Sequence, residues 1–528
     1  MPSAPDAAAP HRTQNWHVRK PSARGHAGMV VSQVSAAAEA GVLMLDAGGS
    51  AADAAVATAF ALAAVEPWNS GLGGIGFAQV MGPGGPAETF DFGPVAPAGL
   101  DPGAFPLTGR NKQDLFAWPE VEGDRNIHGP LSFVIPSAVA GYALLHERYG
   151  RLPLREVLAP AVSLARRGLP VDWYTTLKVA ASAAVLRLYP ESARVFLPNG
   201  LPPIAPYQGT PGFFTLGNLP GTLERLASAG LRDFYEGEVA AAVAADVREM
   251  GGILSAADLA GCRARVLPAV AVPWAGRRLL LANGLTAAPT LRRVLEGMEG
   301  AASGAAAPSA EWYARFARTM RGAYAERLSG LGDAEPRAAE SCTTHLSVCD
   351  RDGMMVAMTT TLLSSMGSRV VLPRSGVLLN NGVMWFDPTP GAPNAMAPGK
   401  RPLTNMCPVI AAGADGRPEI AAGASGGRRI MAAVAQMLSF VGEFGMDLEA
   451  AAHHPRVDVS GPDGATADDR LPAAVLDRLR ADGPVEVVEH GVMPLNFACP
   501  NLIQRAPDGG VAGVSDAMSP WSAAVAQG

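Results

Sequence analysis

Residues 344–363, THLSVCDRDGMMVAMTTTLL, alternate around a DRDG turn. Alternation with period two is typical of strands, and a short turn with Asp and Gly joins antiparallel strands. The segment therefore predicts a β-hairpin. If Arg351 and Asp352 are the turn residues, Thr343 lies opposite Thr360, and Thr361 lies opposite or diagonal to it after a one-residue bulge. Two threonines are then expected to converge where the first strand begins.

Strand and helix patterns alternate in long runs on both sides of the hairpin. A strand after Gly28 leads to a helix that ends at Gly48-Gly49, a second helix that ends near Pro67, and then a glycine loop with a buried strand. Residues 130–250 are mostly helical pattern punctuated by proline, and further strands lead to a glycine turn and helix at 423–445. This order predicts an α+β chain with stacked sheets covered by helices.

The composition excludes several classes of protein. Of the 528 residues, 48% are hydrophobic and 17% charged, which is typical of a globular protein. The net charge of −6 argues against nucleic acid as a partner. The N-terminal residues lack the apolar core of a secretory signal, and the most apolar run contains Asp53 and ends at Glu66-Pro67, so we expect neither secretion nor a membrane span. The five cysteines show no C-x-x-C pair, which fits a reducing compartment, and we expect a cytoplasmic protein.

The stretch ESCTTHLSV, residues 340–348, carries four side chains that could act as nucleophiles: Ser341, Cys342, Thr343 and Thr344. An ordinary strand start would also look like this, because threonine favours strands. A threonine hydroxyl becomes reactive when a base stands beside it. If the chain is cut before the threonine, the new α-amine, with a pKa near 8, is such a base. The loop before Thr343 would then be the removable connection.

Several motifs in order decide between these interpretations. The segments GMVVSQVSAAAEAGVLMLDAGGSAADAAVATAFALAAVEPWNSGLGGIGF, TTHLSVCDRDG, SGVLLNN, PGKRPLTNMCPVI and GASGGRRI resemble the gamma-glutamyltransferase family of N-terminal-nucleophile hydrolases, from about Gly28 to the C-terminus. The resemblance implies a four-layer αββα sandwich formed by two autocleaved fragments. They would be a large subunit, 28–342, and a small subunit, 343–528, after a disordered lead over 1–27.

The resemblance also implies the catalytic residues. Thr343 would be the nucleophile, and the bond between Cys342 and Thr343 would be the one cleaved. Thr361, on the second strand of the hairpin, would hydrogen-bond the nucleophile and assist processing. The backbone amides of Gly426 and Gly427 would form the oxyanion hole. We expect no metal and no organic cofactor, and we interpret His345 as a buried, hydrogen-bonded histidine.

The chain departs from the family where the family binds the amino-acid head of a glutamyl group. Pro102 stands in place of the arginine, Leu363 in place of the asparagine and Trp385 in place of the aspartate. Thr404 and Asn405 replace the paired serines and keep hydrogen-bonding character, and Trp385 with Phe386 would narrow the substrate pocket and favour a small acyl group. The loss of one charged partner from a desolvated site costs roughly 2–5 kcal/mol, so the loss of all three disfavours glutamyl recognition.

These departures favour an amidohydrolase that acts on a small acyl amide bearing a carboxylate. Divergent relatives of this kind include oxamate amidohydrolase and the cephalosporin or glutaryl acylases. Arg428 or Arg429 is the candidate for binding that carboxylate, and a structural role is equally open for each. The alternatives are a gamma-glutamyltransferase or glutathione hydrolase with an altered pocket, and an uncleaved, non-catalytic relative. The partners expected are a small-molecule amide and the two fragments of the chain as a heterodimer, alone or as a pair of heterodimers.

Overall fold

Two seven-stranded antiparallel sheets form the centre of the molecule in the computed structural model, which describes residues 16, 18–111, 119–302, 304–330, 342–461 and 464–528. The first sheet contains, in spatial order, β21 (Ala523–Ala526), β2 (Met29–Ser32), β12 (Cys342–Cys349), β13 (Met355–Leu363), β3 (Ile75–Met81), β4 (Ala87–Phe92) and β9 (Arg265–Pro268). The second contains β1 (Ala23–Gly25), β20 (Val511–Ser515), β19 (Cys499–Arg505), β15 (Pro418–Ser425), β14 (Val409–Ala412), β11 (Arg277–Leu281) and β10 (Val270–Trp274).

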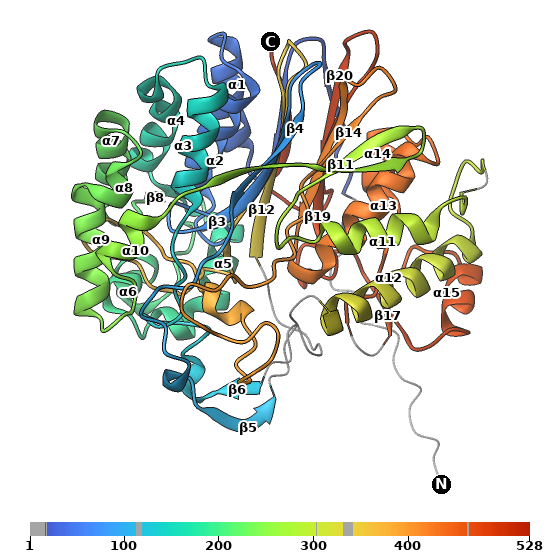
Figure 1. Ribbon diagram of the computed structural model, residues 1–528. Helices are drawn as coiled ribbons and strands as arrows, with labels where there is room; N and C mark the ends of the chain where they lie inside the picture. The colour runs from blue at the N-terminus through green and yellow to red at the C-terminus, as the bar shows by residue number, and fades with distance from the viewer. Residues whose placement is uncertain (1–15, 17, 112–118, 303, 331–341, 462–463) are drawn as a thin grey trace.

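Helices cover the outer face of each sheet, so that the expected four-layer αββα sandwich is confirmed (Figure 1). The first sheet carries α1 (Ser35–Asp46), α2 (Ala51–Val65), α3 (Ala138–Tyr149) and α4 (Leu154–Arg167), followed by α5 (Trp173–Leu186), α6 (Pro190–Phe196), α7 (Leu219–Ala229), α8 (Asp233–Glu236), α9 (Glu238–Glu249) and α10 (Ala256–Gly261). The second carries α11 (Ala288–Met298), α12 (Ala310–Gly330), α13 (Ile430–Gly442), α14 (Leu448–His453) and α15 (Ala473–Arg480).

The two sheets pack face to face through small and medium apolar side chains. Met29 and Ala357 from one sheet and Ile410, Ala421 and Ile503 from the other belong to one buried cluster. Such interdigitation sets the usual spacing between stacked sheets, about 10 Å. This inner layer holds β12 and β15 in the middle of the molecule, where their ends bring Thr343 and Gly426 to one pocket.

The helix α2 follows directly from its sequence. Ser50 caps it and forms a reciprocal capping box with Asp53, and Pro67 follows its last turn. Every residue of α2 is buried, which its many alanines permit, and Gly41 of α1 leaves room for Thr58, whose hydroxyl oxygen would lie 2.3 Å from a Cβ at that position. The predicted helices before Gly48 and Pro67 are therefore confirmed. Among the described helices, none combines the length and hydrophobicity that a bilayer crossing needs.

The β12–β13 hairpin forms as predicted, but its register differs by one residue. Thr344, not Thr343, pairs with Thr360, because the loop between the strands runs from Asp350 to Met354 instead of comprising two residues. The predicted bulge is present between Cys342 and Thr344.

The N-terminal segment is ordered further than expected. Residues 23–25 form β1, which pairs with β20, and the Lys20 ammonium donates to the carbonyls of Asp516 and Ser522, both at 3.1 Å. The expected disordered lead over 1–27 is thus wrong for this part; residues 1–15 and 17 lie outside the described residues.

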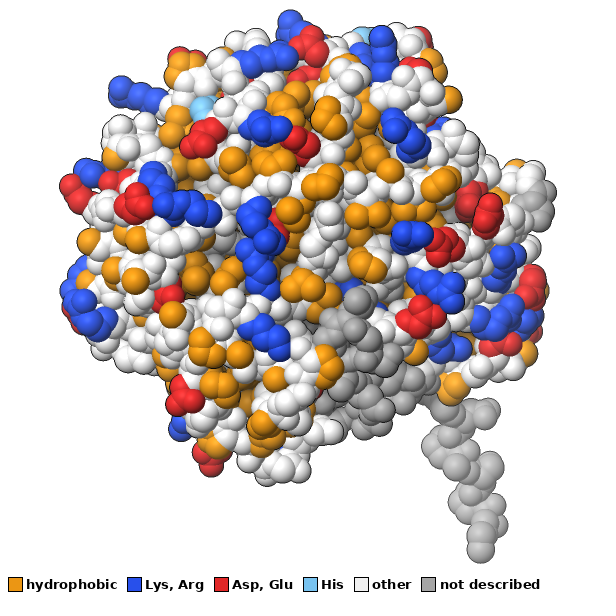
Figure 2. Space-filling model, viewed as in Figure 1, with side chains coloured by type: hydrophobic (Ala, Val, Ile, Leu, Met, Phe, Trp, Pro, Cys, Tyr) orange, Lys and Arg blue, Asp and Glu red, His pale blue; other side chains and the backbone are white. Residues whose placement is uncertain are grey.

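The remaining strands and the surface add little to the site. Three small sheets lie outside the sandwich: β5 (Leu107–Asn111) with β6 (Pro119–Val121), β7 (Leu169–Pro170) with β8 (Phe213–Phe214), and β16 (Val457–Asp458), β17 (Ala465–Asp468) and β18 (Val485–Val488). On the face shown in Figure 2, basic and acidic side chains are interspersed.

Candidate active site

Thr343 lies at the beginning of β12, one residue after the strand starts, and its side chain is only 2% exposed. The bulge at this point breaks the regular pairing with β13. Residues 331–341, which precede β12, belong to the loop that the sequence predicts to be removable, and they lie outside the described residues. A strand position next to a bulge, at the edge of a buried pocket, directs one side chain away from the regular ladder.

The second threonine of the predicted pair is within reach of the first. The Thr343 hydroxyl donates to the Thr361 hydroxyl oxygen at 3.4 Å. The Thr361 oxygen also accepts the backbone N–H of Leu363 at 2.8 Å. Thr361 itself is completely buried, so these contacts fix its side chain against β12. The predicted proximity of the Thr343 and Thr361 side chains is therefore confirmed.

A buried polar network lies beside the two threonines and includes Thr344. The Thr344 hydroxyl donates to Glu66, the residue that ends α2, and lies 3.2 Å from the Gln33 side-chain oxygen. The Asn69 amide donates to Glu66 at 2.8 Å and to Gln33 at 3.4 Å. Gln33 in turn donates to the hydroxyl of Ser425 at the end of β15. The network thus ties both sheets and α2 together at the site.

Burial raises the pKa of Glu66 from its usual 4.5 to about 7, and the hydrogen bonds from Thr344 and Asn69 limit the rise. The position at the C-terminal, partially negative end of α2 acts in the same direction as burial. Near neutral pH this carboxyl is therefore divided between its charged and neutral forms. A group with such a pKa inside a polar pocket is typical of functional sites.

The two glycines of the predicted oxyanion hole form the turn between β15 and α13. Their φ angles are +134° for Gly426 and +62° for Gly427, in the left-handed region that favours glycine. A Cβ on Gly426 would lie 2.8 Å from the Cα of Ala498, so the close packing here also requires glycine. Gly427 opens a short 3-10 turn, Gly427–Arg429, that leads into α13.

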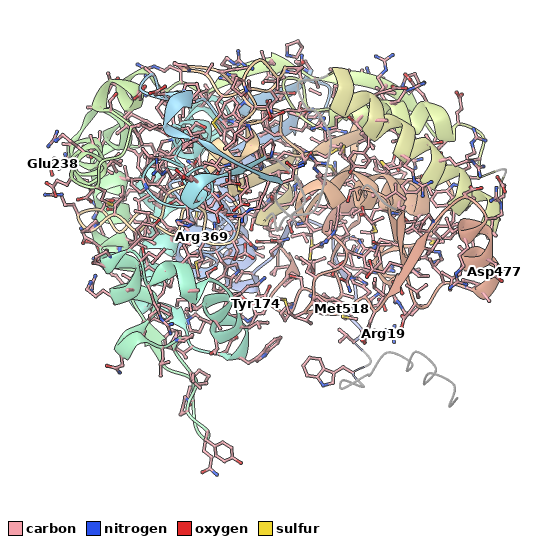
Figure 3. All side chains as sticks on the ribbon, turned by 90° about the horizontal axis from the view of Figure 1, so that it is seen from below. Arg19, Tyr174, Glu238, Arg369, Asp477 and Met518 are labelled. Atoms are coloured by element: carbon pink, nitrogen blue, oxygen red, sulfur yellow. The ribbon has the colours of Figure 1, made fainter. Side chains whose placement is uncertain are left out.

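Thr343 and Gly426 line one pocket of about 440 Å³, counted with its part open to solvent. Its polar lining also includes the following side chains: Gln33, Glu66, Asn69, Tyr174, Lys178, Ser425 and Ser519. Tyr174, from α5, and Met518, from the segment after β20, lie on the same side of the molecule (Figure 3), and both contribute to this lining. The predicted nucleophile and one predicted oxyanion glycine thus share a cavity that is rich in hydrogen-bonding groups.

The predicted substrate-binding residues lie in other surroundings. The Thr404 hydroxyl donates to the carbonyl of Leu285 at 2.9 Å, and the Asn405 side-chain oxygen accepts from the buried Arg327 at 3.3 Å. Trp385 is 3% exposed and belongs to an apolar cluster that also contains Leu363. None of Thr404, Asn405 and Trp385 is among the described residues that line the pocket of Thr343.

The two candidate arginines are placed differently from each other. Arg428 is buried, with its backbone carbonyl accepting the hydroxyl of Tyr324. The Arg429 guanidinium donates to the carbonyl of Leu495. Neither arginine is among the described lining residues of the pocket, although Leu495 is. Pro102, which stands in place of the family's arginine, is exposed at the start of a 3-10 turn, Pro102–Ala104.

His345 is a buried histidine with both ring nitrogens hydrogen-bonded, as predicted. They lie 2.8 Å from the Thr359 hydroxyl and 3.2 Å from the Ser347 hydroxyl. Burial lowers the pKa of His345 to about 3, so the ring stays neutral. No group of histidine, cysteine and acidic side chains in the described part of the chain is arranged to hold a metal ion.

The sequence interpretation missed Gln33, Glu66, Asn69, Tyr174 and Lys178. The first three stand inside the motif segments VSQVS and EPWNS, so a polar residue in these otherwise apolar segments was a usable signal. Tyr174 and Lys178 lie in a helix outside all the quoted motifs, and nothing local distinguishes them.

The fold is that of N-terminal-nucleophile hydrolases: two packed sheets between helical layers. The gamma-glutamyltranspeptidase family model matches residues 37–341 and 335–526. The chain therefore belongs to the gamma-glutamyltranspeptidase family, and it is an enzyme of the amide-hydrolysing or amide-transferring type that this family comprises.

Individual relatives extend over nearly the whole chain. A glutathione hydrolase proenzyme of Escherichia coli (strain K12) is 29% identical over 553 aligned residues, covering 94% of this chain and 91% of its own. An acylase ACY 1 proenzyme of Pseudomonas sp. (strain V22) is 28% identical, covering 96% and 94%. The crystal structure of a cephalosporin acylase from Bacillus halodurans superposes with a TM-score of 0.84 at 23% identity, covering 98% and 99%, and so shares the fold.

Proposed function

We propose that the chain is a self-processing amidohydrolase with Thr343 as its nucleophile, and that it hydrolyses a small acyl amide that carries a carboxylate, with oxamate as the favoured type. The observation that carries the proposal is the pair of buried hydroxyls of Thr343 and Thr361, 3.4 Å apart, at the edge of a pocket that Gly426 also lines. The proenzyme names of the relatives from Escherichia coli and Pseudomonas support self-cleavage.

Processing requires only groups of the chain and water. The Thr343 oxygen attacks the carbonyl carbon of Cys342, the peptide nitrogen takes a proton, and the acyl group moves from nitrogen to oxygen. Water then hydrolyses the ester. The products are the fragments 1–342 and 343–528, which remain associated as a heterodimer because both sheets contain strands from both fragments.

Catalysis uses the new N-terminus. The α-amine of Thr343, with an ordinary pKa near 8, removes the hydroxyl proton as the oxygen attacks the substrate carbonyl. The amides of Gly426 and Gly427 stabilise the oxyanion. The amine then returns the proton to the departing nitrogen, ammonia or an amine leaves, and water hydrolyses the acyl-enzyme by the same route. Thr361 positions the nucleophile through its hydrogen bond.

The substrate assignment rests on what the family pattern lacks here. Pro102, Leu363 and Trp385 offer no charge where the family binds an amino-acid head, and Leu363 and Trp385 are packed in an apolar cluster. A compact, polar pocket with a single lysine suits a short acyl group that ends in a carboxylate. We place the enzyme in the cytoplasm; the four cysteines whose side chains the structure describes are free thiols, which suits a reducing compartment.

A second candidate is favoured by the comparisons. Glutathione hydrolase and acylase relatives match nearly the whole chain at similar identity, so a glutathione hydrolase with an altered pocket and a glutaryl or cephalosporin acylase are the alternatives.

One purification tests self-processing and separates the candidate activities. On a denaturing gel the 54.3 kDa chain should resolve into two fragments, 1–342 and 343–528, and Thr343→Ala should remain a single band at the mass of the whole chain. The processed protein is then given oxamate, glutaramate and a γ-glutamyl anilide. Ammonia release from oxamate supports the proposal. Efficient turnover of the anilide alone would refute the argument from the lost zwitterion contacts, and a single wild-type band would refute self-processing.

A further inference from the structure

We propose that Lys178 binds the carboxylate of the acyl group and is the specificity-determining residue of the pocket that contains Thr343. The inference rests on the proposed function, since it names the group that recognises the substrate of that site. It assigns to α5, a helix outside the family motifs, the role that the sequence alone offered to Arg428 or Arg429.

The charges around the pocket single out Lys178. Among the described residues that line it, Lys178 is the one cationic side chain and Glu66 the one carboxyl. Because Glu66 has a pKa of about 7, it only partly offsets the lysine at neutral pH. Burial raises the pKa of the Cys499 thiol, so that side chain adds no negative charge. An anionic substrate group that enters the pocket therefore meets a net positive field.

Contacts of α5 with neighbouring side chains restrict the position of the Lys178 ammonium. Asp172 caps the helix by accepting the N–H of Thr175 at 2.8 Å, and its other oxygen accepts the indole N–H of Trp521 at 2.7 Å. The ring of Tyr174 packs edge-on against Trp68 with centroids 5.8 Å apart. One turn along the helix, the Lys178 ammonium lies 5.1 Å from the centroid of the Tyr174 ring. A cation held over an aromatic face on a rigid helix is oriented before substrate arrives.

Arg428 and Arg429 are weaker candidates than Lys178 for binding the carboxylate. Neither Arg428 nor Arg429 is among the described residues that line the pocket. Lys178 and Gly426 line the same cavity as Thr343, so an acyl group bound there can contact all three residues. Because this cavity measures about 440 Å³ with its part open to solvent, it favours short, oxamate-like acyl groups over long ones.

The test compares each anionic amide with its neutral isostere: oxamate with oxamide, and glutaramate with glutaramide. Ammonia release is measured with processed wild type, Lys178→Met, Lys178→Arg and Arg155→Met. Arg155 is exposed on α4, so the last variant removes one positive charge without touching the pocket. Each variant is first checked for self-cleavage, because processing reports an intact fold.

Lys178→Met is expected to raise KM for oxamate about 10–100-fold, with kcat changed far less, and to reduce the oxamate-to-oxamide ratio of kcat/KM by a similar factor. Lys178→Arg should restore part of that ratio, and Arg155→Met should leave it as in wild type. Competitive inhibition by the product oxalate should weaken in Lys178→Met by the same factor as KM rises.

An oxamate-to-oxamide ratio that is unchanged in Lys178→Met would overturn the inference and leave the proposed hydrolase standing. A wild type that releases ammonia from the neutral amide at least as well as from the anion would do the same. Absence of both cleavage and ammonia release in the wild type would instead refute the proposed function itself.

Discussion

Glu66 offers the sharpest test of the site's electrostatics. It is 3% exposed, ends α2, and contacts Thr344 and Asn69. The Thr344 hydroxyl has one hydrogen but two acceptors, Glu66 and Gln33, within reach. A protonated Glu66 resolves this conflict, because it donates to Thr344 and frees the Thr344 hydrogen for Gln33. The geometry and the raised pKa therefore agree on a carboxyl that is neutral in weak acid.

The expected effect on stability follows from linkage. A folded-state pKa of about 7, against 4.5 in the unfolded chain, means that the folded protein keeps a proton that the unfolded chain has lost. The contribution of Glu66 is complete below pH 4.5 and is lost as pH rises through 7. At about 1.4 kcal/mol for each pKa unit, the loss is about 3 kcal/mol. Glu66→Gln keeps the shape of the side chain and removes this dependence.

The assay uses Thr343→Ala as the parent, so that the chain stays continuous. Urea unfolding of the parent and of the parent with Glu66→Gln is followed from pH 4 to pH 8. The parent should lose about 3 kcal/mol of unfolding free energy relative to the Glu66→Gln chain across this range. With Thr344→Val in the parent, the loss should extend to higher pH, because the Thr344 hydrogen bond lowers the pKa of Glu66. A difference that stays constant with pH would show that the pKa of Glu66 is the same in the folded and the unfolded chain, and the reasoning from burial would be wrong.

Four further substitutions test other parts of the structure. Gly426→Ala should cost several kcal/mol of stability and abolish activity, since backbone strain and a clash coincide there, whereas Gly48→Ala, at φ +87° with open space around it, should cost only about 1 kcal/mol by thermal unfolding. Thr361→Val should slow self-cleavage by about tenfold or more on a time-resolved gel, because it removes the hydroxyl that contacts Thr343, the proposed nucleophile. Asp516→Asn should destabilise the protein by about 3–5 kcal/mol in urea, because it leaves the buried Arg456 guanidinium, 2.7 Å away, without its carboxylate.

Local sequence signals were sufficient where local contacts decide the structure. The glycine pair after α1, the Ser50 cap and Pro67 fixed the ends of α1 and α2, and alternation predicted the β12–β13 hairpin with its bulge. The register was wrong by one residue for a tertiary reason. Asp350 accepts the N–H of Ala51, at the start of α2, and that of Met354 at 2.9 Å each, which widens the turn. The turn residues alone carry no sign of that contact.

The site was predictable only as far as the motifs reach. Thr343, Thr361 and Gly426 were predicted because they occupy motif positions of the family that the chain resembles. The strand pairing inferred from the predicted turn also brought the two threonines close together. Lys178 and Tyr174 could not be found in this way, since their role depends on how α5 packs against Trp68 and Trp521. The same holds for β1, which exists because β20, close to the opposite end of the sequence, provides its pairing partner.

Leu363 shows how the departures from the family pattern and the geometry of the site are connected. Its φ of +86° is in the left-handed region, which costs a non-glycine residue roughly 1–3 kcal/mol, and its side chain is completely buried. In that conformation the Leu363 N–H donates to the Thr361 hydroxyl oxygen at 2.8 Å. The same oxygen accepts the hydrogen bond from the Thr343 hydroxyl. An asparagine at this position, as in the family pattern, would place a polar group in an apolar cluster with Trp385. The leucine instead holds this backbone conformation through burial and keeps the Thr361 hydroxyl oriented toward Thr343. The proposed recognition of the substrate then lies with Lys178, which lines the pocket of Thr343.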